Sequence, residues 1–285
     1  MSDYALTVLN LGAGVQSTTM ALMAAEGLIK PMPDFAVFAD TGWEPQGVYE
    51  TLDWLHEILP FEVRKVSAEY NGQPASLKTD MIDGFNVTRS HRHMSIPLHL
   101  HHPDGRKGIG TRQCTSAYKV LPIQRAIRRE LGVGYKKRVP KDTMVEQWLG
   151  ISTDEAIRMR DSRVPWSQHR YPLIDMGFTR QDCLEWFRSR HPNRELTRSA
   201  CVGCPFRTNK EWLDVREQDP QGFAEAVEID RLIRSPDYDT MLATNPFLHY
   251  SMQPLDVAVE EASKQKDMNP SFPGFLNECD GLCGV

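Results

Sequence analysis

Long apolar runs are missing from this sequence. Although 40% of the 285 residues are hydrophobic, no segment reaches the roughly 18–20 consecutive apolar residues that a membrane-spanning helix requires. No basic segment precedes an apolar one near Met1, so a secretory signal is not expected. Internal repeats and low-complexity segments are also missing. These absences predict a globular cytoplasmic protein with no membrane partner, and no feature specifies its oligomeric state.

Positive charge is scarce overall but concentrated in one stretch. The formal net charge is −5, which argues against a protein that coats nucleic acid with its whole surface. Between Arg106 and Arg138, however, there are ten Lys or Arg residues and one acidic residue, Glu130. The stretch 106–138 is therefore either a local site for a nucleic-acid substrate or a solvated basic helix face.

The order of the N-terminal elements predicts an α/β fold. Short apolar segments at 5–10 and 35–38 and a segment at 61–66 that alternates apolar and polar residues are typical of strands, and helical patterns at 17–26 and 48–59 separate them. This order predicts a parallel sheet flanked by helices.

Regular periodicity fades over 71–111, where glycine and proline are frequent, and we expect a long functional loop or an insertion there. Further along, the pattern predicts a helix at 120–131, a strand at 145–151, a short helix from about 153 and another helix at 180–188.

The turn between the first strand and the first helix is rich in small and polar residues, namely Gly12, Ala13, Gly14, Gln16, Ser17 and Thr18. Small residues let backbone N–H groups approach a phosphate, and the helix N-terminus and two hydroxyl groups add further attraction. The turn is not a Walker loop, because the Lys-Ser/Thr pair is missing. Tight packing without a ligand is the alternative explanation.

A second polar segment, Asp40, Thr41 and Gly42, follows the second strand at the edge where open α/β sheets bind ligands. Together the two segments resemble the PP-loop (adenine nucleotide alpha-hydrolase-like) superfamily, and within it the phosphoadenylyl-sulfate reductase family. Members carry Ser-Gly-Gly-x-Asp-Ser and then Asp-Thr-Gly. Here Gly12 replaces the first Ser and Gln16 replaces the Asp, as in some sulfonucleotide reductases.

This resemblance implies a PP-loop nucleotide-binding domain over 1–175 and a helical, cysteine-rich region over 176–285. It implies ATP or a related adenine nucleotide at 12–19 and 40–42, with Mg2+ as a candidate companion. The similarity continues through Lys119-Val-Leu-Pro122 and Tyr171-Pro172-Leu173. The segment from Gly150 to Arg158 is similar to one that contacts substrate phosphate or sulfate, which implies a catalytic role for Arg158. An exposed helix cation is the alternative.

Five of the six cysteines are candidates for a metal centre or reactive thiols. Cys201 and Cys204 are separated by two residues, which lets both thiolates face one metal. Cys114, Cys279 and Cys283 complete the five, whereas Cys183 lies in a helical pattern and is interpreted as a packing residue. Tetrahedral thiolate sites serve iron–sulfur clusters and zinc alike, so spacing leaves both open.

The resemblance implies a division among these thiols. In cluster-bearing sulfonucleotide reductases the ligands come from segments like those around Cys114 and Cys201–Cys204, and a C-terminal Glu-Cys carries the nucleophile. That assigns Cys279 as catalytic nucleophile and Cys114, Cys201, Cys204 and Cys283 as ligands of a 4Fe-4S cluster, with zinc as second choice. A cluster with three protein ligands would free Cys283.

Five histidines between 91 and 102 invite a metal interpretation, namely His91, His93, His99, His101 and His102. They share no regular spacing with a carboxylate or a cysteine, so we expect a solvent-exposed loop instead.

Three functions are consistent with these features. The first is an ATP pyrophosphatase-like sulfur-transfer enzyme that adenylates DNA or tRNA, with a cysteine desulfurase as candidate sulfur donor, similar to phosphorothioation enzymes. The second is an adenylyl-sulfate or phosphoadenylyl-sulfate reductase in which Cys279 attacks sulfur. The third is a non-catalytic nucleotide- or nucleic-acid-binding subunit, which Gln16 favours. The basic stretch and the extra C-terminal cysteine favour the first.

Overall fold

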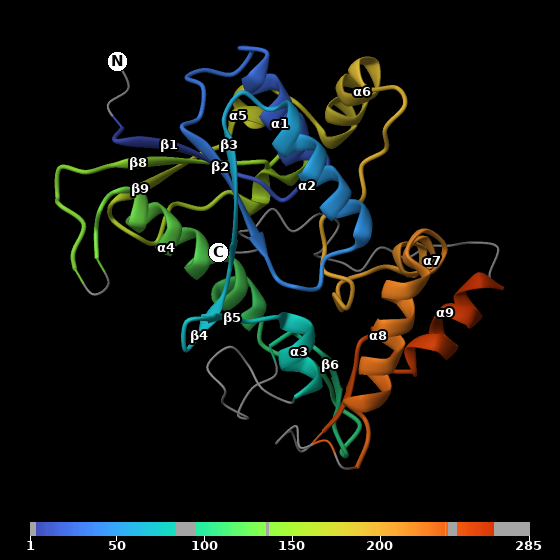
Figure 1. The fold of residues 1–285 in the computed structure, drawn as a ribbon. Helices are drawn as coiled ribbons and strands as arrows, with labels where there is room; N and C mark the ends of the chain where they lie inside the picture. The colour runs from blue at the N-terminus through green and yellow to red at the C-terminus, as the bar shows by residue number, and fades with distance from the viewer. Residues whose placement is uncertain (1–3, 84–94, 135–136, 237, 239–243, 265–285) are drawn as a thin grey trace.

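A five-stranded parallel sheet forms the centre of the fold (Figure 1). The computed structural model describes residues 4–83, 95–134, 137–236, 238 and 244–264. The strand order is β3-β2-β1-β8-β9, and every pairing is parallel. The strands are β1 (Leu6–Asn10), β2 (Phe35–Asp40), β3 (Glu62–Ser67), β8 (Val145–Leu149) and β9 (Ser167–Arg170). The α/β class with a parallel sheet is thus confirmed.

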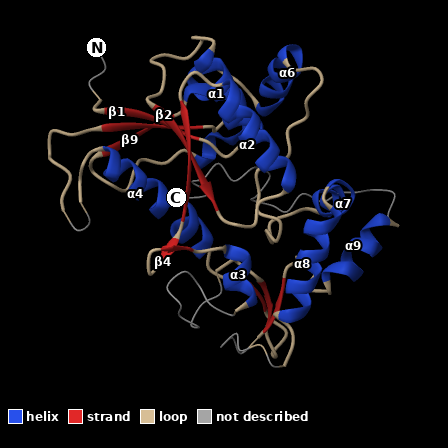
Figure 2. Cartoon of the chain, viewed as in Figure 1, coloured by secondary structure: helices blue, strands red, loops and turns tan. Residues whose placement is uncertain are grey.

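Helices cover both faces of this sheet, as Figures 1 and 2 show. Because successive strand residues point to opposite faces, Leu9 packs in one core and Val8 in another. The Leu9 core includes the helices α1 (Val15–Ala25), α2 (Gln46–Ile58) and α6 (Arg180–Arg190), and the Val8 core includes α4 (Leu121–Glu130). Both faces of β1 and β2 are therefore buried, which explains their nearly continuous apolar sequences.

A separate hydrophobic core lies below the sheet in Figure 1. Its elements are α3 (Leu77–Ile82), α7 (Asn209–Gln218), α8 (Pro220–Leu232), α9 (Leu255–Ser263) and a small antiparallel sheet of β6 (His99–His101), β7 (Lys107–Ile109) and β10 (Asn245–Phe247). Trp43 and Tyr118 pack there with Trp212, whereas Cys183 and Phe187 of α6 join the main core. The division at residue 175 stays a prediction, and segments from both sides of it share the Leu9 core and the separate core.

Two details of the local structure differ from the sequence prediction. The described part of 71–111 is not one loop, because α3, β6 and β7 form there and β6 pairs with β10 from far along the chain, whereas the alternative of an insertion stays a prediction. Sequence periodicity could not show a pairing between such distant segments. The edge strand β9 was also missed, because its sequence Ser-Gln-His-Arg is polar throughout.

The remaining elements are short. They are the hairpin β4 (Glu69–Tyr70) and β5 (Gln73–Pro74), the π-helical turn η1 (Thr115–Val120), the 3-10 turn η2 (Thr153–Arg158) and α5 (Pro172–Asp175). Turn η1 runs directly into α4, and such π-helical turns occur frequently at functional sites. None of the described helices has the length and hydropathy that crossing a membrane demands.

Candidate nucleotide loop and cysteine pocket

The glycine-rich turn lies at the topological switch point of the sheet. Strands β2 and β3 lie on one side of β1, and β8 and β9 lie on the other. In open α/β sheets, ligands bind at the carboxyl ends of the strands at such a point. The turn at 11–14 leaves the carboxyl end of β1 and enters α1.

The backbone of this turn is strained and internally bonded. Ala13 has a φ of +54°, a left-handed conformation that is uncommon for residues other than glycine and that clusters at ligand sites. The Gly12 N–H donates to the hydroxyl oxygen of Ser17 at 3.0 Å. Gly150, directly after β8, packs so closely that a Cβ there would lie 2.9 Å from the Ser17 nitrogen. The turn is therefore built from the ends of two neighbouring strands.

Two buried polar atoms at the start of α1 lack protein partners. Gln16 and Thr18 are fully buried, yet among the described residues neither Gln16 Oε1 nor Thr18 Oγ1 has a hydrogen-bond partner. Buried polar groups in folded proteins nearly always have one. Water or a bound ligand is therefore needed to satisfy these atoms.

The Asp40 segment forms a tight turn at the end of β2. Asp40 Oδ1 accepts from the Gly42 N–H at 2.8 Å and from the Tyr49 hydroxyl at 2.9 Å. Burial and the Asp40 carboxylate raise the pKa of Tyr49, so this phenol stays protonated and donates. Gly42 has a φ of +72°, and a Cβ there would lie 2.7 Å from Ser76 Oγ. Asp40 therefore holds the turn that presents Thr41.

Arg158 lies on the 3-10 turn η2, and Glu155 connects it to the glycine-rich turn at the start of α1. Its Nη1 donates to Glu155 Oε1 at 2.7 Å, and the opposite oxygen, Oε2, accepts from Gln16 Nε2 at 2.9 Å. The side chain of Glu155 is fully buried and that of Arg158 is 18% exposed. The exposed-cation interpretation of Arg158 is therefore wrong, whereas its catalytic role stays a prediction.

Three of the five candidate cysteines converge on one small pocket. Cys114 at the start of η1 lines it together with Cys201 and Cys204. Leu77, Ile96 and Phe206 also line the pocket, which has a volume of about 40 Å³. Burial raises the pKa of Cys114, and it raises that of Cys201 with a further contribution from Glu44. Cys279 and Cys283 lie outside the described residues, so their proposed roles remain predictions.

A buried ion pair borders this pocket. Lys119 Nζ lies 3.8 Å from Glu44 Oε1, and both side chains are at most 5% exposed. Burial by itself would lower the pKa of Lys119, but Cys201 and Glu44 outweigh it and raise that pKa. Glu44 Oε1 also accepts from the Thr41 hydroxyl at 2.9 Å and from the Cys201 thiol at 3.3 Å. Neither Lys119 nor Glu44 is among the site residues that the sequence predicts.

The loop between Cys201 and Cys204 is fixed by its neighbours. The buried Arg207 guanidinium donates to the carbonyl oxygens of Ala200 and Cys201 at 2.7 and 3.1 Å. Gly203 packs against the ring of Trp43, because a Cβ there would lie 2.0 Å from Trp43 Cη2. The Trp43 carbonyl accepts from the Val202 N–H at 2.8 Å. Both cysteines are thus held in place before any metal binds.

The histidine segment was expected to be an exposed loop, and this expectation was wrong for His99. The His99 ring is buried and its Nε2 lies 3.0 Å from the Pro205 carbonyl oxygen. His101 is exposed on the same strand, and His91 and His93 lie outside the described residues. His99 and His101 are two residues apart and therefore share one face of β6, but only His99 lies in the interior, beside the Pro205 carbonyl.

The cysteine pocket can be compared with two kinds of metal centre. Across the described residues, no three His, Cys, Asp or Glu side chains are grouped closely enough to hold one ion. Zinc needs thiolates within about 4 Å of one another, since Zn–S bonds are about 2.3 Å long. An iron–sulfur cluster spreads its cysteine ligands farther apart. Three cysteines line one pocket, and the choice between an iron–sulfur cluster and zinc stays a prediction.

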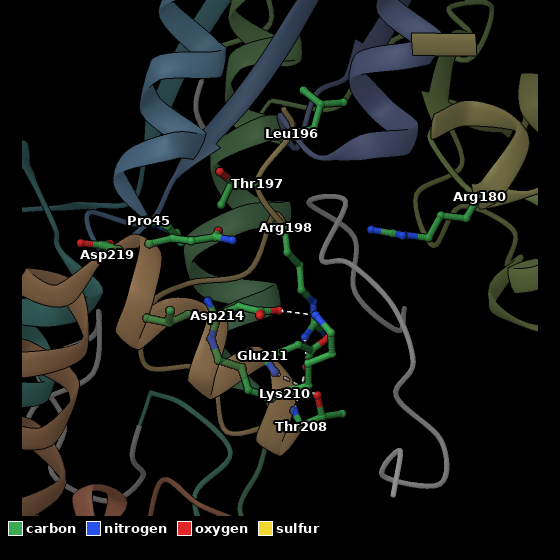
Figure 3. Close-up of a pocket in the computed structure, with 13 residues that line it drawn as sticks. Pro45, Arg180, Leu196, Thr197, Arg198, Thr208, Lys210, Glu211, Asp214 and Asp219 are labelled. Atoms are coloured by element: carbon green, nitrogen blue, oxygen red, sulfur yellow. Dashed lines mark hydrogen bonds and ion pairs between the residues drawn. The ribbon is translucent and has the colours of Figure 1, made fainter. Parts of the chain in front are cut away.

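A larger cavity of about 520 Å³ adjoins the cysteine pocket, and Arg198 lines both. Figure 3 shows Arg180 extending from α6 toward Arg198 and the side chains of α7. Arg198 forms an ion pair with Glu211, and the Arg180 N–H donates to Asp154 Oδ1 at 3.0 Å. Arg198 therefore connects this cavity with the cysteine pocket, and Arg180 lines it from α6.

The basic stretch 106–138 does not form one uniform surface. Lys119 is buried beside the cysteines and Arg112 lines their pocket. Arg106 pairs with Asp104, and Arg129 pairs with Glu69. Arg125 is exposed on α4. Only part of the stretch is thus on the surface, while two of its cations belong to the cysteine pocket.

No protein-family model and no curated protein matches the chain. Among solved structures, the phosphoadenylyl-sulfate (PAPS) reductase from Candida auris, in a phosphate complex, is similar. It shares 15% sequence identity over 66% of this chain and 73% of that chain, with a TM-score of 0.40. At this score the likeness does not assign the site, which depends on the residues described above.

Proposed function

We propose that the chain is a PP-loop ATP pyrophosphatase-like enzyme that transfers sulfur. The turn at 12–19 holds the phosphates of ATP, and the Asp40–Gly42 segment lines the nucleotide pocket. An acceptor oxygen attacks the α-phosphorus and pyrophosphate leaves. The terminal sulfur of a persulfide, supplied by a donor such as a cysteine desulfurase, then displaces AMP from the adenylated acceptor. An external thiol cleaves the resulting disulfide and leaves the sulfur on the acceptor.

The observation that carries this proposal is the contact between Thr41 and Cys201. Their Oγ1 and Sγ atoms are 3.3 Å apart, so the carboxyl edge of the sheet directly adjoins the cysteine pocket. In open α/β folds that edge is where nucleotides bind. A nucleotide and a sulfur centre at adjacent positions suit chemistry in which an adenylate is exchanged for sulfur.

The two unpartnered polar atoms support the nucleotide half of the proposal. Gln16 Oε1 and Thr18 Oγ1 are buried without partners among the described residues, beside a backbone turn strained at Ala13. Strained backbone and unsatisfied polar groups are typical of ligand sites rather than of structural turns.

The cavity lined by Arg180, Arg198 and Lys210 supports a large acceptor. Its volume of about 520 Å³ is within the range of small-molecule and cofactor sites. The carboxylates of Glu211 and Asp214 in its wall are neutralised by Arg198 and Lys210. The third lining carboxylate, Asp219, accepts from backbone N–H groups, and the lining cations outnumber the carboxylates by four to three, which favours a phosphate-bearing acceptor such as DNA or tRNA.

A second candidate is sulfonucleotide reduction, which the small cysteine pocket favours. Its volume of about 40 Å³ and the cations Arg112 and Lys119 in its lining suit a compact anion of sulfate size. Cys279 would attack the sulfur of an adenylyl sulfate and AMP would leave. An external thiol would then release sulfite from the enzyme.

Two threonines offer a matched test of the nucleotide site. The Thr18 hydroxyl has no partner among the described residues, whereas that of Thr19 donates to the Cys183 carbonyl at 3.3 Å. Thr18→Val should leave stability unchanged and weaken ATP binding about tenfold, by the loss of a hydrogen bond to a charged group. Thr19→Val should lower stability without changing ATP affinity. The reverse pattern in calorimetry and thermal unfolding would contradict the proposed site.

Product analysis separates the candidate functions. Release of pyrophosphate from ATP, stimulated by DNA or tRNA, is expected for sulfur transfer. Formation of sulfite from an adenylyl sulfate, abolished in Cys279→Ser, would establish the reductase instead. A protein that binds nucleotide and turns over neither substrate would be the non-catalytic subunit that Gln16 favours.

A further inference from the structure

A buried carboxylate connects the nucleotide loop with Arg158. Glu155 is 1% exposed, and its two oxygens face different partners. Oε2 accepts from Gln16 Nε2 at 2.9 Å, and Oε1 accepts from Arg158 Nη1 at 2.7 Å. Two segments distant in sequence, the start of α1 and the turn η2, are thus joined through one side chain.

The chemistry of the pair determines how Gln16 is oriented. An ionised carboxylate can only accept hydrogen bonds, so the NH2 group of Gln16 must face Glu155. Nε2 also lies 3.4 Å from Ser152 Oγ, another acceptor on the same segment. Gln16 Oε1, which has no partner among the described residues, is therefore the atom left for a ligand.

The same carboxylate sets the position of Arg158. The Arg158 side chain is 18% exposed and its ion pair with Glu155 is largely shielded from water. Arg158 is also near Arg112, whose pKa is lowered mainly by burial and in part by Arg158, and Arg112 lines the cysteine pocket. Arg158 is thus held between the nucleotide loop and the cysteines.

We propose that Glu155 is a positioning residue for nucleotide binding, which turns the Gln16 carbonyl oxygen toward a donor group of the nucleotide, such as a hydroxyl or amino group, and holds the Arg158 guanidinium where it can receive phosphate oxygens. The proposal rests on the nucleotide site proposed above. It concerns a residue that acts through its two neighbours without touching the nucleotide itself.

The sign of one change in affinity tests this role. Glu155→Gln removes a negative charge near an anionic ligand. If Glu155 had no positioning role, the variant would therefore bind ATP more tightly than the wild type. A positioning residue gives the opposite result, and we expect the ATP Kd to rise about tenfold. The exposed neighbour Asp154 provides the control, since Asp154→Asn also removes a negative charge and should leave the Kd unchanged or lower it.

A second variant covers the case in which Glu155→Gln does not fold. Glu155→Asp keeps the charge but is one methylene shorter, so it cannot bridge Gln16 and Arg158 together. We expect the ATP Kd to rise about tenfold in this variant as well. An ATP Kd equal to or below that of wild type in either folded variant would overturn the proposal.

The reciprocal variant Gln16→Glu/Glu155→Gln tests the pairing itself. It restores one amide facing one carboxylate, so thermal unfolding without nucleotide should recover at least half of the stability lost in Glu155→Gln. No recovery would contradict the pairing. The proposed function itself fails if the wild-type chain binds neither ATP nor an adenylyl sulfate. The positioning role alone fails if the wild-type chain binds ATP and the Glu155 variants bind it equally well.

Discussion

The hydroxyl oxygen of Thr41 lies 3.3 Å from the sulfur of Cys201, and both side chains contact the same carboxylate oxygen of Glu44. This arrangement joins the end of β2 to a cysteine loop from the distant C-terminal half of the chain. Because Lys119 pairs with that carboxylate, one buried polar cluster connects the sheet edge, the π-helical turn and the cysteines. Changes at any member should therefore affect the others.

Removal of the buried cation should be costly. Lys119→Met leaves the Glu44 carboxylate buried without its ion-pair partner, and breaking such a pair costs about 3–5 kcal/mol. Denaturant unfolding of the metal-free chain should show this loss in the free energy of unfolding. The double variant Glu44→Gln/Lys119→Met, which buries no charge, should recover most of it. Lys137→Met, at an exposed position, serves as control. If Lys119→Met alone were as stable as the double variant, the pairing of Lys119 with Glu44 would be contradicted.

The loop between Cys201 and Cys204 should not tolerate a side chain at its centre. In Gly203→Ala the new Cβ would lie 2.0 Å from Trp43 Cη2, and Trp43 is itself buried. Overpacking of this kind costs about 1–3 kcal/mol, which thermal unfolding should detect. The smaller ring in Gly203→Ala/Trp43→Phe should relieve the contact. Gly134→Ala, whose Cβ would meet only Lys137 Cγ at 3.8 Å, should change little. Equal stability of the two alanine variants would disprove the contact.

Acid should destabilise the folded chain through the buried side chain of His249. Its ring is buried, with Nε2 3.0 Å from Asn209 Oδ1 and Nδ1 2.7 Å from Ser251 Oγ. Burial, with a smaller contribution from His99, lowers the pKa of His249 to about 4. Between about pH 6.5 and pH 4 the unfolded chain therefore binds a proton that the folded chain does not. Stability is complete above pH 6.5 and falls as the pH drops, by up to about 3 kcal/mol at pH 4.

The measurement is the free energy of unfolding across this pH range, compared with His249→Gln. The variant should lose less stability between pH 7 and pH 4 than the wild type, whatever its stability at pH 7. His56→Gln, at an exposed helix position, should retain the wild-type slope. An unchanged slope in His249→Gln would assign the acid sensitivity to other groups.

The sequence predicted the elements whose patterns are local. The strands β1, β2 and β3 and the helices between them can be predicted from the order of apolar and polar residues, because each pattern lies within a short segment. Strand β9 is polar and β6 is very short, so each depends on partners that only the tertiary fold supplies. The polar turn after β1 and the Asp40 segment could likewise be found, since both follow strands directly.

Buried charges could not be found in this way. Lys119, Glu44 and Glu155 are residue types that usually lie on the surface, and only long-range packing reveals that they are buried and paired. For Glu44 and Glu155, a weak indication of a role in the site is nevertheless present in the sequence. Glu44 follows Asp40-Thr41-Gly42 closely. Glu155 lies in the segment from Gly150 to Arg158, which is similar to one that contacts substrate phosphate or sulfate.

The cysteine pocket leads to a prediction about metal content. Purified without oxygen, the full chain should contain iron and sulfide and absorb near ~400 nm, as expected for cysteine-ligated clusters. Cys114→Ser, Cys201→Ser and Cys204→Ser should each lose most of the iron, because all three thiols line one pocket. Cys183→Ala should keep it, since Cys183 packs in the core of the main sheet. Zinc without iron would contradict the cluster, and iron retained in all three serine variants would place the ligands elsewhere.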